Sequence, residues 1–110
     1  MSAEANLVFF GLRFDLSEEE VESADIRKHP LVAQAGSAGL EHYMANFGGS
    51  ESLYYLFIGK KIGLTGAENA VEIMVPSDQL AFIVEETQKK LQNANLDGSP
   101  TLYVNWIADA

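Results

Sequence analysis

Residues 6–16 have the sequence NLVFFGLRFDL, and this stretch decides the fold that we expect. Its even positions are all hydrophobic, which is the period-two alternation of a β-strand. Its odd positions are also hydrophobic at first, with Leu7 and Phe9, and turn polar only at Arg13 and Asp15. A strand that is hydrophobic on both sides at one end is typical of the middle of a sheet that is covered on both faces there.

Further strands are predicted by the same kind of pattern. Residues 53–58, LYYLFI, are hydrophobic at every position and predict a second inner strand, which can continue to Ile62. Alternating segments predict three more strands, over residues 40–47, 71–75 and 101–107.

The clearest helix prediction covers residues 78–95, after the candidate N-cap Ser77. Its hydrophobic side chains fall on one stripe of a helix. Phe82 lies off this stripe, so we expect it to be exposed and treat it as a candidate for a contact surface, although a single exposed Phe is common. The residues of the stripe are Leu80, Ile83, Val84, Thr87, Leu91 and Ala94.

Two shorter helical segments are predicted between the first two strands. Ser17 and Glu20 form a capping-box pattern, which predicts a short helix after the first strand. Pro30 favours a second helical segment through Ala35, which the small residues 36–39 would end.

These segments follow the order β-α-β-β-β-α-β in a single α+β domain over residues 1–110. The order resembles a ferredoxin-like plan with one extra hairpin strand, so we expect a mostly antiparallel sheet with its helices on one face. The resemblance concerns architecture alone, because no family motif accompanies it, and architecture does not specify function.

The composition restricts the class of protein. The chain has 110 residues, 47% of them hydrophobic, which is ordinary for one globular domain. It contains no cysteine, so it has no disulfide framework and no thiolate metal site. Its first residues lack the positive charge of a secretory leader, and no hydrophobic run approaches the ~18 residues of a membrane span. We therefore expect a soluble, cytoplasmic protein.

The net charge is −9, from 16 acidic residues against 7 Lys and Arg. This balance disfavours nucleic acid as a partner, because binding it depends on cations that neutralise phosphates, and it equally disfavours an anionic membrane. It is compatible with a basic protein partner, although an acidic surface also serves solubility alone.

A search for chemical motifs finds no cofactor or metal site, and we predict neither. The glycine-rich residues 59–66 lack the Lys-Ser/Thr pair and the following helix of a phosphate-binding loop, although Lys60 and Lys61 remain candidates for contact with an anion. The acidic residues between Asp15 and Asp25 lack the central glycine of a calcium loop. The two histidines, His29 and His42, fall in different predicted elements.

Four residues are candidates for a binding site by residue type: His42, Asn46, Tyr54 and Trp106. His42 and Asn46 share one face of a predicted strand, and a histidine next to an amide is suited to acid–base work. A histidine with only a structural role on a strand is the commoner case. No catalytic residue is assigned.

The predicted plan leaves one face of the sheet without helices. The inner strands have more large hydrophobic side chains than one face accommodates, and an exposed patch of them promotes association. These side chains come from Leu7, Phe9, Tyr54, Leu56 and Ile58. We expect a second copy of the chain to cover this face, in a homodimer; the residues 23–39 or a ligand are the alternatives. The predicted function is a small protein-binding or regulatory protein that self-associates; the alternative is a small-ligand-binding protein or enzyme with its site on the open face.

Overall fold

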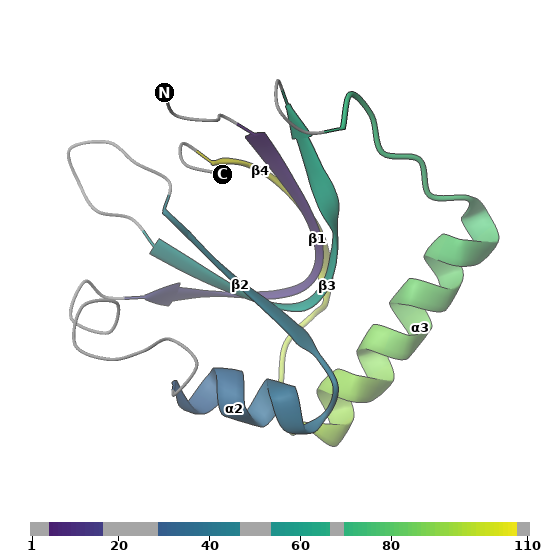
Figure 1. Ribbon diagram of the computed structural model, residues 1–110. Coiled ribbons are helices and arrows are strands. Elements are labelled where there is room, and N and C mark those ends of the chain that lie inside the picture. Colours follow the sequence, from purple (N-terminus) through teal and green to yellow (C-terminus); the bar gives the residue numbers. More distant parts are fainter. Residues whose placement is uncertain (1–4, 17–28, 47–53, 67–69, 108–110) are drawn as a thin grey trace.

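The computed structural model describes residues 5–16, 29–46, 54–66 and 70–107 of the chain. They form one antiparallel sheet with the strand order β2-β3-β1-β4, and two helices (Figure 1). The predicted α+β class with an antiparallel sheet is therefore confirmed. The strands are β1 (Ala5–Leu16), β2 (Glu41–Asn46), β3 (Tyr54–Gly66) and β4 (Thr101–Ile107), and the helices are α2 (Pro30–Ser37) and α3 (Ser77–Asn93).

The two strands that are hydrophobic on both sides occupy the centre of the sheet, as predicted. β1 and β3 pair along their whole length, from Ala5 opposite Gly66 to Leu16 opposite Tyr54. β2 and β4 form the two edges.

The predicted strand over residues 71–75 is wrong. β3 instead continues to Gly66, and of the described residues 70–76 only Ala70 is bridged to it, at Thr65. Both sides of β1 are already occupied, by β3 and β4, so the alternating segment has no free edge to join there. Its Ile73 packs on the sheet at Gly63, where an added Cβ would lie 2.9 Å from the Ile73 Cδ1 atom.

The helix boundaries follow local chemistry. Pro30 begins α2, and the side chain of His29 caps it by accepting a hydrogen bond from the backbone N–H of Leu31, at 3.2 Å. Gly39, with a left-handed φ of 80°, then turns the chain into β2. Ser77 is the first residue of α3 and not its N-cap; the N-cap is Pro76, which has no side-chain hydrogen bond to give. The short helix predicted after Ser17 lies outside the described residues.

A pair of glycines bends the centre of the sheet. Gly11 and Gly59 face each other across β1 and β3, with φ of 155° and 153°. A Cβ added at Gly11 would lie 2.1 Å from the carbonyl oxygen of Ile58, so only glycine fits. The inner strands curve strongly, which gives the sheet a convex and a concave face (Figure 1).

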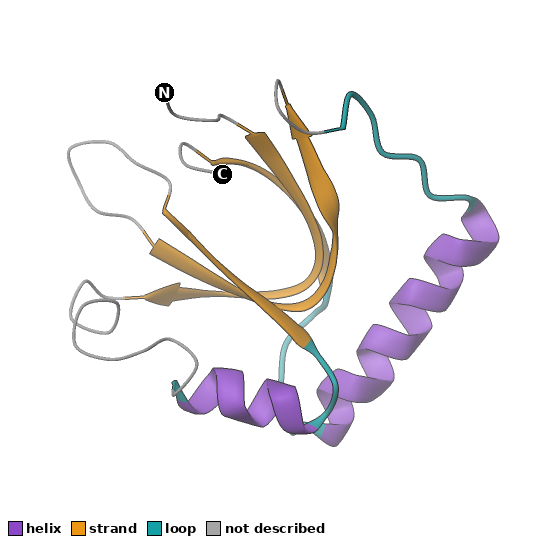
Figure 2. Cartoon of the chain, in the orientation of Figure 1, coloured by secondary structure: helices purple, strands orange, loops and turns teal. Residues whose placement is uncertain are grey.

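Both helices lie on the convex face (Figure 2). Residues of α2 and α3 such as Val32, Ala35 and Leu91 pack there against Leu12 and Ile58 of the inner strands. This helix-side core agrees with the prediction that the helices share one face of the sheet.

The concave face is a second hydrophobic core. Phe9 and Phe57 have their ring centroids 5.4 Å apart, and Tyr103 meets Phe57 edge-on at 5.6 Å. Leu7, Phe9 and Phe57 are fully buried within a single chain. These large side chains of the inner strands therefore need no second copy to bury them: Leu7 and Phe9 are buried on the concave side, while Leu56 and Ile58 belong to the helix-side core.

Candidate functional site

The four residues that the sequence proposes for a site do not gather into one site: three lie on β2 and β3, and Trp106 lies at the opposite edge of the sheet. His42 is exposed on β2, opposite Ile58, and Asn46 lies opposite Tyr54 in the same ladder. Tyr54 is partly buried against the helix-side core. Trp106 is on β4, at the other edge of the sheet. His42, Tyr54 and Trp106 also all belong to the helix side, and not to the face without helices on which the site was expected.

The largest exposed hydrophobic residues of the sheet lie on β4. Leu102, Val104 and Trp106, which we call the β4 row, are 49%, 63% and 47% exposed. Register places them on the helix side, since Leu102 lies opposite Phe10, which in turn lies opposite Lys60 at the edge of α3. Hydrophobic residues scattered singly on a surface are normal, but three in a row on one strand form a patch.

The β4 row is exposed because the helices stop short of it. α3 packs on β1 and β3, and α2 packs on β2 and β3. Neither helix packs extensively on β4, as its place at the far edge of the sheet predicts. The alternation of β4 was visible in the sequence, but its exposure depends on which strands the helices cover, which the sequence does not show.

α3 also leaves part of its own hydrophobic stripe uncovered. Thr87 and Leu91, toward its C-terminal end, are 4% and 3% exposed, whereas Leu80 in its first turns is 36% exposed. The helix therefore diverges from the sheet toward its N-terminus (Figure 1). Phe82 is 63% exposed, as its position off the stripe predicted.

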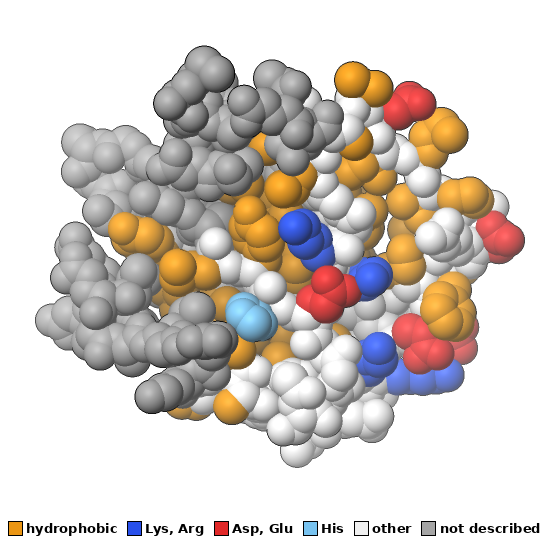
Figure 3. Space-filling view, in the orientation of Figure 1, with side chains coloured by type: hydrophobic (Ala, Val, Ile, Leu, Met, Phe, Trp, Pro, Cys, Tyr) orange, Lys and Arg blue, Asp and Glu red, His pale blue; other side chains and the backbone are white. Residues whose placement is uncertain are grey.

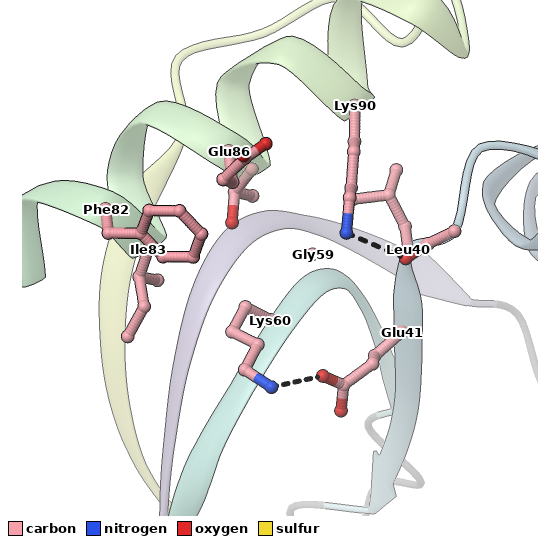
Figure 4. Close-up of a pocket in the computed structure, with 10 residues that line it drawn as sticks. Leu40, Glu41, Gly59, Lys60, Phe82, Ile83, Glu86 and Lys90 are labelled. Atoms are coloured by element: carbon pink, nitrogen blue, oxygen red, sulfur yellow. Dashed lines mark hydrogen bonds and ion pairs between the residues drawn. The ribbon is translucent and has the colours of Figure 1, made fainter. Parts of the chain in front are cut away.

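A cleft of about 360 Å³ lies between α3 and the β2–β3 side of the sheet. Phe82 and Ile83 of α3 point over it, and Gly59 lies at its floor (Figure 4). The Nζ atom of Lys60 is 2.9 Å from the Glu41 carboxylate, an exposed ion pair that contributes at most about 1 kcal/mol. Its lining thus combines a hydrophobic wall with the paired charges of Lys60 and Glu41 and with the charged side chains of Glu86 and Lys90.

The two candidate anion contacts do not converge. Lys60 belongs to the helix side, next to α3, whereas Lys61 lies opposite Phe9 on the concave side. The Nζ atom of Lys61 is 5.0 Å from the centroid of the Tyr43 ring. Each lysine therefore serves a different face, and together they do not form an anion site.

Cations stack on the tyrosines around the concave core. The guanidinium of Arg13 is 4.4 Å from the centroid of the Tyr55 ring and 4.9 Å from that of Tyr103. Cation–aromatic contacts of this kind are worth about 0.5–1 kcal/mol at exposed sites. Burial raises the pKa of Tyr43 above its usual value. The arrangement covers a hydrophobic core with amphipathic side chains, which is a structural role.

The described residues give no sign of a metal centre, since no three His, Asp or Glu side chains among them gather closely enough to hold an ion. Among the helices that the structure describes, none combines the length and hydrophobicity needed to cross a bilayer. Figure 3 shows acidic and basic side chains side by side over α3 and the neighbouring strands, so this face has no uniform charge.

No protein-family model, curated protein or solved structure matches the chain. Among the described residues, the β4 row is the one place where three exposed large hydrophobic side chains share one face of a strand.

Proposed function

We propose that this chain is a small self-associating interaction protein, which acts by binding polypeptides, its own copies among them. The observation that supports this proposal is the β4 row, a strip of large hydrophobic side chains on an edge strand. Fully burying such a side chain stabilises by about 1.5–3 kcal/mol. Since the three residues are 47–63% exposed, covering each of them gains roughly 1 kcal/mol.

The proposed contact surface is the β4 edge and not the face without helices that the sequence alone predicted. The concave face, expected to be left open, is already filled by the side chains of one chain. The exposed large hydrophobic side chains that remain lie on the β4 edge, on the first turns of α3 at Leu80 and Phe82, and in the segment before α3 at Val71 and Met74.

A second polypeptide partner would be basic. The support is the net charge of −9 of the whole chain and not the charge of α3, where Glu85 is paired with Lys89 at 3.6 Å. Charge of one sign steers a partner of the opposite sign and speeds encounter. A cytoplasmic location completes the proposal, and the lack of cysteine supports it.

The finer architecture is also part of the proposal. We infer a ferredoxin-like plan over a single domain of residues 1–110, without the extra hairpin strand. Its support is the element order β-α-β-β-α-β among the described residues, together with the central position of the first and third strands.

The proposed function is tested by measuring mass and exposed hydrophobic surface together. Light scattering behind size exclusion, over about 1 to 100 µM, is expected to give a mass above that of one 12.0 kDa chain. An apolar fluorescent dye is expected to bind the wild type, and less so the Leu102→Ser/Val104→Ser variant. The control is Val71→Ser, which changes a residue that is 96% exposed outside the β4 row. A single chain at every concentration that binds no dye would contradict the proposal.

A small-ligand-binding protein or enzyme is the second candidate, and the α3 cleft favours it. Its volume of about 360 Å³ falls within the range of small-molecule pockets. This function predicts that some metabolite in a screen raises the unfolding temperature of the wild type, and that Phe82→Ser removes the shift. A shift that persists in this variant would place the ligand elsewhere.

A further inference from the structure

We infer that the chain forms a homodimer in which the β4 strands of two copies pair antiparallel, with Val104 on the two-fold axis. The two four-stranded sheets would then be one continuous sheet, with all the helices on the same side. This inference rests on the proposed function, because it specifies how self-association occurs.

Among the described residues, β4 is an edge strand with one side unpaired. One side of β4 pairs with β1, from Ala5 opposite Ile107 to Gly11 opposite Thr101, and no strand of the described chain lies along its other side. An edge strand presents a row of backbone N–H and C=O groups, which is a template for pairing with another strand.

The two edges of the sheet differ in how they are protected. Natural edges are commonly blocked by charged side chains or proline. β2 has Glu41 and His42 exposed, and Glu41 is held in its ion pair with Lys60. β4 has the sequence TLYVNWI, which contains no charge and no proline. A second copy is therefore expected at β4 and not at β2.

The sequence of β4 is complementary to itself. When two copies of Thr101–Ile107 pair antiparallel about Val104, all of its residues find an opposite residue. On the helix side, Leu102 lies opposite the partner's Trp106, and Val104 lies opposite the partner's Val104. On the other side, Tyr103 lies opposite the partner's Asn105. Aromatic and β-branched side chains placed opposite each other stabilise a strand pair.

The charge of the chain also favours contact through β4. Each copy carries a net charge of −9, so two copies repel each other at most orientations. Contact through a strand without charged residues keeps the carboxylates of the two copies apart. Association is therefore expected to strengthen as salt screens the remaining repulsion.

Other surfaces suit a second copy less well. The large side chains of the concave core are already buried, so covering that face again removes little hydrophobic area from water. The exposed Phe82 stands among charged residues of α3, including the ion pair of Glu85 with Lys89, and a symmetric contact there would have to take these charges out of water.

The first experiment compares two charge substitutions by sedimentation velocity at 20 and 300 mM salt. We expect wild type to sediment as a dimer of 12.0 kDa chains, more so at 300 mM. Val104→Lys places two ammonium groups against each other on the axis, and it should raise the dissociation constant at least tenfold. Val71→Lys adds the same charge outside β4 and should leave the dimer intact. Circular dichroism verifies that each variant is folded.

The second experiment determines the register of the β4 pair with engineered cysteines. Because the chain has no cysteine of its own, any disulfide must join the introduced residues. Under mild oxidation we expect a disulfide in Val104→Cys alone, or between Tyr103→Cys and Asn105→Cys when the two variants are mixed. Opposite residues of an antiparallel pair alternate between hydrogen-bonded and closer, non-hydrogen-bonded positions. Either the Val104–Val104 pair or the Tyr103–Asn105 pair must therefore be of the closer kind, which a disulfide can bridge. Gln88→Cys on α3 is the exposed control. Cross-linking no faster than in this control would overturn the register.

The outcomes separate this inference from the proposed function. If wild type associates but Val104→Lys associates equally well, self-association stands and the β4 dimer is wrong. If wild type is a single chain that binds the apolar dye, the β4 dimer is wrong and a different polypeptide is the partner. If it is a single chain that binds no dye, both are wrong.

Discussion

At the scale of single residues, the two facing glycines of the inner strands carry the heaviest constraint. Gly11 and Gly59 approach so closely that a side chain on either one would collide with backbone of the opposite strand. Gly36 is the contrasting case, because it lies within α2 and a Cβ there would meet nothing within 4 Å.

The glycines predict stability changes of opposite sign. Gly11→Ala should destabilise by about 2–4 kcal/mol, from the clash together with backbone strain. Gly36→Ala should stabilise by about 0.5–1 kcal/mol, since glycine in a helix costs that much relative to alanine. Urea unfolding of the two variants and the wild type measures both. Equal stability of Gly11→Ala and wild type would show that the strands do not approach as described.

Tyr43 predicts a loss of stability at high pH. Burial raises the pKa of its phenol in the folded state, so the unfolded chain loses this proton at lower pH. Its contribution to stability is therefore fully present below pH 10 and falls as the pH rises through the folded-state pKa. Urea midpoints between pH 8 and 11 should fall more steeply for wild type than for Tyr43→Phe. Parallel curves would contradict the prediction.

At the scale of elements, the C-terminal half of α3 packs in the helix-side core, whereas its N-terminal half does not. Leu91 is buried, whereas Leu80 and Phe82 are exposed. Stability within a protein varies locally in this way, and regions with few buried contacts open most readily.

This division predicts a gradient along α3. Amide hydrogen exchange should be faster over residues 80–84 than over residues 87–91. Leu91→Ala should destabilise by about 2–5 kcal/mol, while Phe82→Ala should change the free energy of unfolding by less than about 1 kcal/mol. Uniform protection along the helix would mean that its first turns are held as firmly as its last.

The sequence predicts the secondary-structure elements better than it predicts which elements pack against each other. Hydrophobic residues on both faces identified β1 and β3 as inner strands, because a strand in the middle of a sheet is buried on both sides. Period-two alternation wrongly assigned residues 71–75 to a strand, since whether an alternating segment joins a sheet depends on a free edge. Patterning also missed the β4 row: it showed hydrophobic residues on alternate positions of β4, but not that α3 would leave them uncovered.

At the scale of the whole molecule, hydrophobic cores on both sides of one sheet coexist with a strongly acidic surface. The helix-side core and the concave core share the inner strands, so damage to either should unfold both. The net charge of −9 opposes compaction by self-repulsion.

The acidic surface predicts that salt stabilises the fold. Raising sodium chloride from about 20 to 300 mM should raise the unfolding temperature, because screening weakens repulsion among carboxylates. Calorimetry of the Val104→Lys variant measures this without any contribution from association. A falling unfolding temperature would indicate that attractive ion pairs, such as Glu41 with Lys60, outweigh the repulsion.

The close approach of Gly11 and Gly59 limits how this sequence can change during evolution. Neither position tolerates a methyl group while the other strand stays in place, so the two sites are locked together during sequence divergence. Substitution at one of them would flatten the sheet and disrupt the packing of the concave core. A distant homologue that keeps this curvature should therefore retain both glycines, one in each of two strongly hydrophobic strands, even where the rest of its sequence has diverged.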